Sequence, residues 1–336
     1  MPGMSTAPAP DTAPALAAEA PADPDAGQPG PVRRWLDDPR IAALRNAPGL
    51  VRGLSLATLV ANIVVVGTGA AVRLTGSGLG CPTWPKCTAG TYTNTAEYGI
   101  HGYIEFGNRM LTFVLSTIVG AVIIAVVVQR ARRRSITWLA LAQFGGIAAQ
   151  AVLGGITVRT GLNPWTVSAH FLVSMVLIYA AYVLWHRSGE GDGERRWLVR
   201  APLRWVARGI VLVSGLTIVI GTIVTGSGPH GGDRNAARTG FDPALVAQGH
   251  ADAVFLLIGL TVAGVLAFWS AGAPAAVRQA ALALLGIELA QGLIGYVQYF
   301  THLPIVLVGI HMLGASVLWV AALRVLFTIR ERACTD

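Results

Sequence analysis

Residues 304–327 read PIVLVGIHMLGASVLWVAALRVLF, a run of 24 residues whose ionisable side chains are His311 and Arg324. At about 1.5 Å per residue, a helix of this length crosses a hydrocarbon core of roughly 30 Å. Seven more stretches of this kind precede it, at residues 54–74, 104–128, 137–158, 165–186, 206–225, 246–270 and 277–299. The sequence therefore predicts an all-α integral membrane protein with eight transmembrane helices.

The composition of the whole chain supports this fold class. Of the 336 residues, 53% are hydrophobic and 12% are charged, and the mean hydropathy is +0.57. The net charge of +8 comes from arginine between the spans, with Lys86 as the sole lysine. Because such arginines report membrane topology, the composition excludes soluble enzymes and gives no indication of nucleic-acid binding. Three cysteines are too few for a disulfide-scaffolded secreted fold.

The positions of the basic residues predict the orientation of the chain. Of the 25 basic residues, 19 lie in or beside the segments before the first span and after the even-numbered spans, and 6 lie on the other side. Short cytoplasmic loops retain Lys and Arg. We therefore expect a multi-pass protein of a bacterial cell membrane with both termini in the cytoplasm.

We expect the eight spans to form two pseudo-symmetric four-helix bundles. The N-terminal stretch is rich in Ala, Pro, Asp and Gly and lacks apolar periodicity, as disordered segments do. The expected organisation is a disordered cytoplasmic tail at 1–50, a first half at 51–187, a cytoplasmic linker at 188–205, a second half at 206–328 and a cytoplasmic tail at 329–336.

Matching landmarks indicate that the halves are copies of one repeat. A glutamine in the third span precedes a glycine by four residues and a histidine by 20, and the seventh span starts the same pattern. The residues are Gln150, Gly154 and His170, and Gln291, Gly295 and His311. Thr-Gly-Ser-Gly also follows both the first and the fifth span. The pseudo-two-fold axis of a parallel repeat lies along the membrane normal.

Ionisable groups inside a membrane are costly and usually functional, and the even-numbered spans place polar groups at one depth. His250 and His311 each lie seven residues, or about 10 Å, after the proline at which their helix enters the membrane, Pro243 and Pro304. Two neutral imidazoles on facing helices suit an iron porphyrin, so we expect a heme site there. The first half offers His170, with Asn108 where the repeat offset of about 142 predicts a histidine.

The second span also carries a carboxylate at this depth. His101, Glu105 and Asn108 are spaced i, i+4 and i+7 and share a helix face. A carboxylate beside a heme could act as a general base or stabilise a developing cation. The alternatives are an ion pair with Arg109 and a side chain that reaches the membrane interface.

With these features the chain resembles the heme A synthase family, of the actinobacterial type. The points of resemblance are TGSGLGCPTWPKC at 75–87, IEFGNR at 104–109 and the histidines of the fourth, sixth and eighth spans. The resemblance extends over about residues 54–328. It implies that heme O binds in the first half and that its C8 methyl group is oxidised to a formyl group, giving heme A for terminal oxidase assembly. It also implies a heme b held by His250 and His311.

The resemblance carries over to individual residues of the second span. Glu105 falls on the family's catalytic glutamate and Arg109 on its arginine, whereas Asn108 replaces a histidine. This leaves open whether His170 is the sole protein ligand of the substrate iron or whether His101 takes the place of the missing ligand.

The resemblance further implies a disulfide between Cys81 and Cys87 on the outer side of the membrane. The alternative is two free thiols in an ordered loop. Cys334, in the C-terminal tail, is expected to be a free thiol.

Two other functions are compatible with part of this pattern. A di-heme cytochrome b electron carrier explains the histidines but not Glu105 beside an incomplete ligand pair. A transporter explains the repeat, although the histidine-bearing spans lack an internal proline. The expected partners are heme O and membrane lipid, with heme O synthase and a quinone or other electron acceptor as further candidates. Homo-oligomerisation is left open.

Overall fold

The computed structural model describes residues 38–39, 42–43, 47, 49–129 and 133–332. The chain divides into two units, Met1–Ala43 and Leu44–Asp336, and all the helices discussed below belong to the second. Most of the expected N-terminal tail and Cys334 lie outside the described residues.

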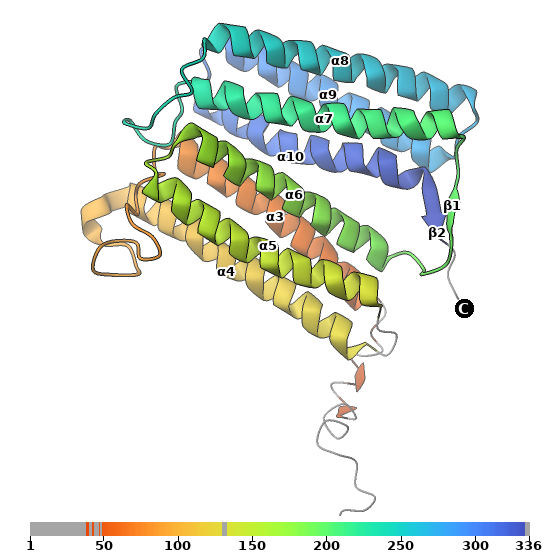
Figure 1. The fold of residues 1–336 in the computed structure, drawn as a ribbon, viewed down its shortest axis with the longest axis horizontal. Helices are drawn as coiled ribbons and strands as arrows, with labels where there is room; N and C mark the ends of the chain where they lie inside the picture. The colour runs from red at the N-terminus through yellow and green to blue at the C-terminus, as the bar shows by residue number, and fades with distance from the viewer. Residues whose placement is uncertain (1–37, 40–41, 44–46, 48, 130–132, 333–336) are drawn as a thin grey trace, which may run out of the picture. The chain divides into compact units, whose positions relative to one another are not determined.

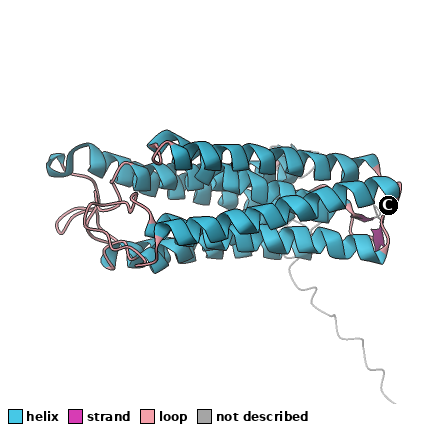
Figure 2. Cartoon of the chain, turned by 90° about the horizontal axis from the view of Figure 1, so that it is seen from above, coloured by secondary structure: helices cyan, strands magenta, loops and turns pink. Residues whose placement is uncertain are grey.

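Within the described residues, eight long helices of 24 to 30 residues each run side by side with their connections at the two ends (Figures 1 and 2). They are α3 (Leu50–Leu74), α4 (Gly99–Val128), α5 (Arg134–Arg159), α6 (Pro164–Ser188), α7 (Ala201–Ser227), α8 (Pro243–Ser270), α9 (Ala275–Phe300) and α10 (Ile305–Thr328). A short 3-10 helix, η1 (Ala96–Tyr98), precedes α4. All eight are long and apolar enough to cross a membrane, which confirms the predicted fold class.

Local sequence signals determine where two of the histidine-bearing helices begin. The side chain of Asn163 accepts a hydrogen bond from the backbone N–H of Trp165 at 3.0 Å, and that of Asp242 accepts one from Ala244 at 2.8 Å. In both helices a proline follows the capping residue, as is favoured at the first helical position. These caps therefore set the depth at which the histidines of α6 and α8 lie.

The helices form two four-membered groups. In the first, α3, α4, α5 and α6 each pack on the next and α6 packs back on α3; α7 to α10 repeat this arrangement. Consequently α4 lies diagonally opposite α6, and α8 lies diagonally opposite α10. The two groups meet through α3 and α6 on one side and α7 and α10 on the other. This arrangement agrees with the expected pair of four-helix bundles.

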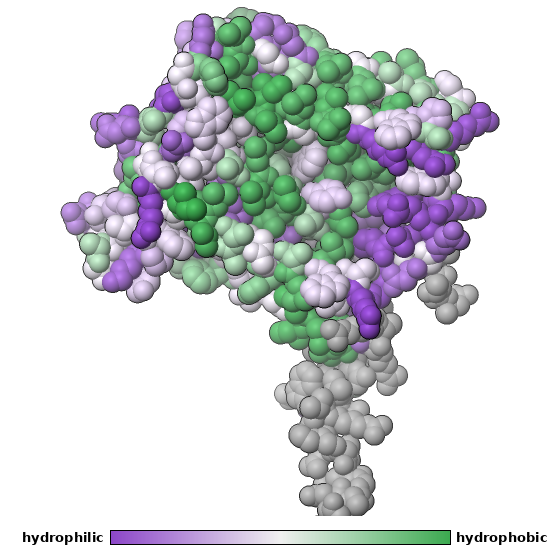
Figure 3. Space-filling view, in the orientation of Figure 1, coloured by the Kyte–Doolittle hydropathy of each residue, from purple (hydrophilic) through white to green (hydrophobic). Residues whose placement is uncertain are grey.

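Small and branched side chains fill the interior of the second group. Phe268, Leu284, Ala280 and Ala281 are among the buried residues of its core. Small residues let membrane helices approach closely, and packing rather than water exclusion then holds them together. On the face drawn in Figure 3, hydrophobic side chains occupy the band between two more hydrophilic ends. The outward-facing apolar residues are therefore placed to meet lipid.

The segment predicted as a linker, 188–205, contains regular structure. Strand β1 (Arg195–Trp197) pairs antiparallel with β2 (Arg330–Arg332), and α7 already begins at Ala201. The Arg133 side chain donates hydrogen bonds to both carboxylate oxygens of Asp192, at 2.7 and 2.8 Å. The hydrogen bond from Arg133 is the main reason why the pKa of Asp192 lies below its ordinary value. These contacts tie the start of the linker to α5.

We predict that Phe268→Ala destabilises the protein far more than Phe255→Ala. Both phenylalanines lie on α8, but Phe268 is fully buried whereas Phe255 is 57% exposed. Truncating a buried phenylalanine leaves a cavity and costs roughly 3 kcal/mol. Thermal unfolding in detergent should show a clearly lower Tm for Phe268→Ala and little change for Phe255→Ala. Equal shifts would contradict the packing described above.

Candidate functional site

The second helix group brings two histidines together from diagonally opposite helices. The ring centroids of His250 on α8 and His311 on α10 are 6.4 Å apart, and the ring planes are nearly perpendicular at 82°. Two imidazoles bound to opposite sides of one metal ion, at about 2 Å each, have their centres roughly 6 Å apart. Nδ1 of His311 is buried without a hydrogen-bond partner among the described residues. The pair therefore fits an axial ligand set.

Glycines allow these rings to lie directly against neighbouring helices. A Cβ at Gly221 on α7 would stand 3.1 Å from Cε1 of His250, and one at Gly295 on α9 would stand 3.7 Å from Cε1 of His311. The first of these contacts is tighter than ordinary van der Waals packing, so Gly221 is needed for the observed ring position.

The same glycine contact recurs in the first helix group. A Cβ at Gly154 on α5 would stand 3.2 Å from Cε1 of His170. Gln150, one turn earlier, donates hydrogen bonds to the carbonyl oxygen of His170 at 2.9 Å and to Oγ of Ser174 at 2.6 Å. The glutamine, glycine and histidine of the repeat therefore form one packed unit, in which α5 supports the histidine-bearing α6.

The first helix group lacks a second imidazole at this level. Asn108, on α4, accepts a hydrogen bond from Oγ1 of Thr68 on α3 at 2.7 Å. His101 is exposed, and its Nδ1 lies 2.9 Å from Oγ of Ser77 in the loop after α3. Seven residues, or about 10 Å of helix, separate His101 from Asn108. The two halves thus differ at the positions where ligands were expected.

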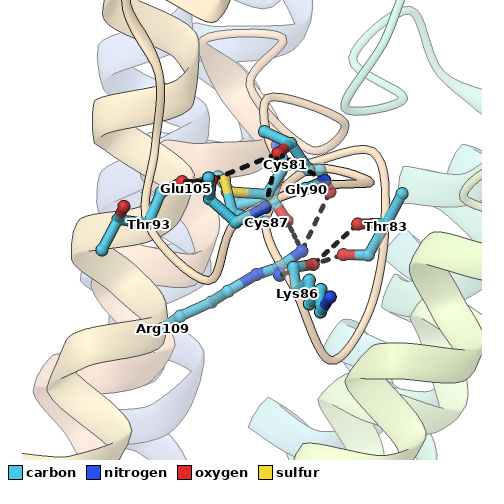
Figure 4. The surroundings of a disulfide bond; sticks show 10 residues. Cys81, Thr83, Lys86, Cys87, Gly90, Thr93, Glu105 and Arg109 are labelled. Carbon is cyan, nitrogen blue, oxygen red and sulfur yellow. Dashed lines mark hydrogen bonds and ion pairs between the residues drawn. A yellow bond between two sulfur atoms is a disulfide. The ribbon is translucent and has the colours of Figure 1, made fainter.

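A disulfide-closed loop lies over the N-terminal end of α4 (Figure 4). Cys81 and Cys87 are bonded to one another, which confirms the expected disulfide. Arg109 donates hydrogen bonds to the carbonyl oxygens of Cys81 at 2.9 Å, Thr83 at 3.1 Å and Lys86 at 3.3 Å. The side chain of Arg109, on α4, therefore binds the loop backbone at three residues.

Glu105 joins the same network. Its Oε1 forms an ion pair with Nη2 of Arg109 at 2.5 Å, and its Oε2 accepts a hydrogen bond from the backbone N–H of Cys81 at 2.6 Å. The ion pair considered as an alternative to a catalytic role is thus present. Glu105 is only 6% exposed, and each of its oxygens has a donor. This arrangement holds a carboxylate rigidly inside the first helix group.

Close backbone contacts position the loop. A Cβ at Gly80 would collide with the backbone carbonyl of His101 on α4, and one at Gly155 on α5 would collide with the ring of Trp84. The loop therefore reaches from α4 to α5.

The sequence reasoning missed one buried carboxylate. Glu288, on α9, is 1% exposed and accepts a hydrogen bond from Oγ1 of Thr261 on α8 at 2.8 Å. Its other oxygen has no partner among the described residues. It is the only acidic residue of the span at 277–299, a signal that could have revealed it. The repeat offered no help, because the matching position in the first half is Ile147.

The residues present suit a macrocycle better than a metal ion held by protein ligands alone. Among the described residues, no group of three or more His, Cys, Asp or Glu side chains is arranged to hold a metal ion. A metal between His250 and His311 would take its remaining ligands from a porphyrin. Fold and site together define a multi-pass helical membrane protein with two facing imidazoles in one half and a carboxylate beneath a disulfide loop in the other.

Comparison with known proteins assigns the chain to a family. A model of the COX15-CtaA family, described as cytochrome oxidase assembly protein, matches residues 52–229, and the chain belongs to this family. This confirms the resemblance seen in the sequence at the level of the family.

Individual relatives are similar over part of their length. Heme A synthase of Listeria welshimeri is 34% identical over 131 residues, which are 39% of this chain and 42% of the relative. Heme A synthase of Geobacillus kaustophilus is 29% identical over 144 residues, 43% and 44% of the two chains. That of Bacillus licheniformis is 24% identical over 178 residues, 52% and 58% of the two chains. The matches thus span about half the length of these relatives.

We predict that Arg109→Gln makes the disulfide easier to reduce. Hydrogen bonds from a charged group contribute about 1.5–3 kcal/mol each, so losing those of Arg109 should speed reduction by roughly 10-fold or more. The rate is measured by treating the protein with a mild thiol reductant, alkylating the freed thiols and determining the mass. Arg159→Gln, an equal change of charge at an exposed position at the same end of the helices, is the control. Equal reduction rates in both variants would show that Arg109 does not hold the loop.

Proposed function

We propose that the protein is a heme A synthase that oxidises the C8 methyl group of heme O to a formyl group. One observation carries this proposal: the two repeated halves differ in a way that suits a division of labour. The second half has two imidazoles that face one another, whereas the first has one half-buried histidine, an asparagine and the carboxylate of Glu105, which Arg109 holds. Family membership and the names of the matched relatives support the same reading.

In this proposal His250 and His311 hold a resident heme b. The 6.4 Å separation of their rings and the glycine beneath each ring support the assignment. When bound, heme b supplies one-electron redox chemistry. The protein orients the two imidazoles through packing on α7 and α9 and surrounds them with apolar helices that exclude water.

The substrate, heme O, binds in the first half. His170 is the protein ligand that we assign to its iron, because its ring lies in the helix group that also contains Glu105 and is supported by Gln150 and Gly154. Asn108, hydrogen-bonded to Thr68, offers no imidazole at this level. We assign His101 to the anchoring of the loop through Ser77.

Glu105 is the catalytic residue of the proposal. Oxidation of a methyl group attached to a porphyrin develops positive charge at that carbon, and a fixed carboxylate stabilises such charge without reorganising. Arg109 and the N–H of Cys81 hold the carboxylate in one orientation. The disulfide loop excludes water from the outer end of the site.

The orientation in the membrane is part of the same proposal. The arginine distribution supports cytoplasmic termini in a bacterial cell membrane. The disulfide loop then faces the outer side, where thiols oxidise readily. We further propose that heme O synthase supplies the substrate and that a quinone accepts the electrons. We also propose that the protein is of the actinobacterial type.

We predict that Glu105→Gln abolishes heme A formation while leaving heme b bound. Removing one preorganised electrostatic group lowers a rate by roughly 100- to 1,000-fold. The variant is expressed in a host that makes heme O but lacks its own heme A synthase, and the extracted hemes are separated with mass detection. Glu97→Gln, in the exposed η1 turn, is the control and should form heme A normally. Normal output from Glu105→Gln would remove Glu105 from the mechanism.

We also predict that His250→Gly and His311→Gly each lose the redox heme, and that added imidazole restores it. Imidazole can fill the space left by the deleted ring, so its effect separates loss of a ligand from loss of the fold. Heme content and reduced-minus-oxidised spectra are the measurements. The control is His302→Asn, at an exposed loop position with a φ of 61° that asparagine tolerates. Full heme content in either glycine variant without imidazole would contradict the ligand assignment.

A further inference from the structure

A pocket of about 410 Å³ lies at the end of the second helix group that carries the β1–β2 pair. It is enclosed by the segment leading into α7 and by the turn between α8 and α9 at 271–273. Val199 and Leu203 contribute apolar walls, and Arg200 and Arg204 contribute basic ones. A pocket with both apolar and basic walls suits an amphiphilic ligand better than a simple ion.

The basic walls have unused hydrogen-bond donors. Nε of Arg204 donates to the carbonyl oxygen of Val199 at 3.1 Å, and the guanidinium lies 4.6 Å from the centre of the Trp197 ring. These contacts fix the side chain, but within residues 133–332 the terminal nitrogens of Arg204 have no hydrogen-bond partner. The exposed side chain of Arg200 has none there either. The terminal nitrogens of Arg204 and the guanidinium of Arg200 can therefore donate to an anion.

The arrangement of charge favours such an anion. Arg204 and Arg208 are four residues apart near the start of α7, so they share one side of the helix, and Arg200 directly precedes the helix. Like charges at this spacing repel one another. At the same end of the helices, Arg133 is neutralised by Asp192, and Arg196 by Glu331. The cluster on α7 has no comparable carboxylate among the described residues.

The surface beyond the cluster is apolar. Trp205 is 67% exposed, and Leu212 and Leu216, further along α7, are also exposed. These positions are seven and four residues apart, so they continue one outward face of the helix. A phosphate group at the arginines and a hydrocarbon chain along this face would both find complementary surfaces.

We propose that this pocket binds the phosphodiester headgroup of an anionic phospholipid, whose acyl chain lies along the exposed face of α7. Basic pockets at the ends of transmembrane helices bind such headgroups through charge and hydrogen bonds. The proposal does not depend on the heme chemistry. It defines a lipid site on the surface of the second half, separate from the histidine pair.

The test uses the purified full chain after delipidation in a neutral detergent. Phosphatidylglycerol should raise Tm by roughly 3 °C, whereas phosphatidylcholine and inorganic phosphate should not. Native mass spectrometry gives the lipid affinity directly. Arg200→Gln combined with Arg204→Gln should weaken phosphatidylglycerol binding at least 10-fold. Arg134→Gln combined with Arg196→Gln is the control, with the same loss of charge at the same end of the helices.

Four outcomes would overturn the proposal. Equal binding of phosphatidylglycerol by the two double variants would place the site elsewhere. An equal response to phosphatidylcholine would show that charge is not recognised, and an equal response to inorganic phosphate would identify a soluble anion as the ligand. A photoreactive phosphatidylglycerol on the unmodified protein tests the site without mutation. Labelling within residues 197–208 is expected, and labelling confined to other helices would contradict the proposal.

Discussion

A polar side chain within a bilayer has no water to bind, so it must face another helix, and this constraint organises the described structure. His250 and His311 meet across the interior of one helix group because α8 and α10 are its diagonal members. Glu105 is buried in the other group, where an arginine and a backbone N–H occupy its oxygens. Glycines at the contact points let the imidazoles lie against neighbouring backbones. The depth of the polar residues along their helices, the order in which the helices pack and the small residues between them together position both candidate sites.

The differences between the halves matter as much as their common plan. Gly154 and Gly295 support His170 and His311 in the same way, so the repeat preserves the frame of the site. On the opposite helix, however, one half has a histidine and the other has Asn108, bound to α3. The half without the second imidazole is also the half in which a carboxylate, that of Glu105, is held by an arginine beneath the disulfide loop. In our proposal, this divergence separates a resident redox group from a substrate.

Much of this organisation could be predicted from the sequence, because membrane helices are recognised by their length and hydropathy. The eight spans and the predicted depth of the histidines follow from patterns within single segments, and the repeat follows from comparing those segments. The contacts of Arg109 with three carbonyl oxygens do not, since they depend on how an irregular loop folds back on α4. The burial of Glu288 was not predicted because its partner, Thr261, lies on another helix and carries no charge. The short strand in the linker pairs with a segment more than 130 residues away in sequence, which no local pattern indicates.

The division of labour between the halves is the central claim, and the heme content of the chain tests it most directly. The protein is purified from two hosts, one with and one without the ability to make heme O, and the bound hemes are extracted and quantified. The account predicts one heme b per chain without heme O, and an additional heme O or its oxidised product when heme O is supplied. Two hemes b per chain in both hosts would contradict it and would favour a di-heme electron carrier.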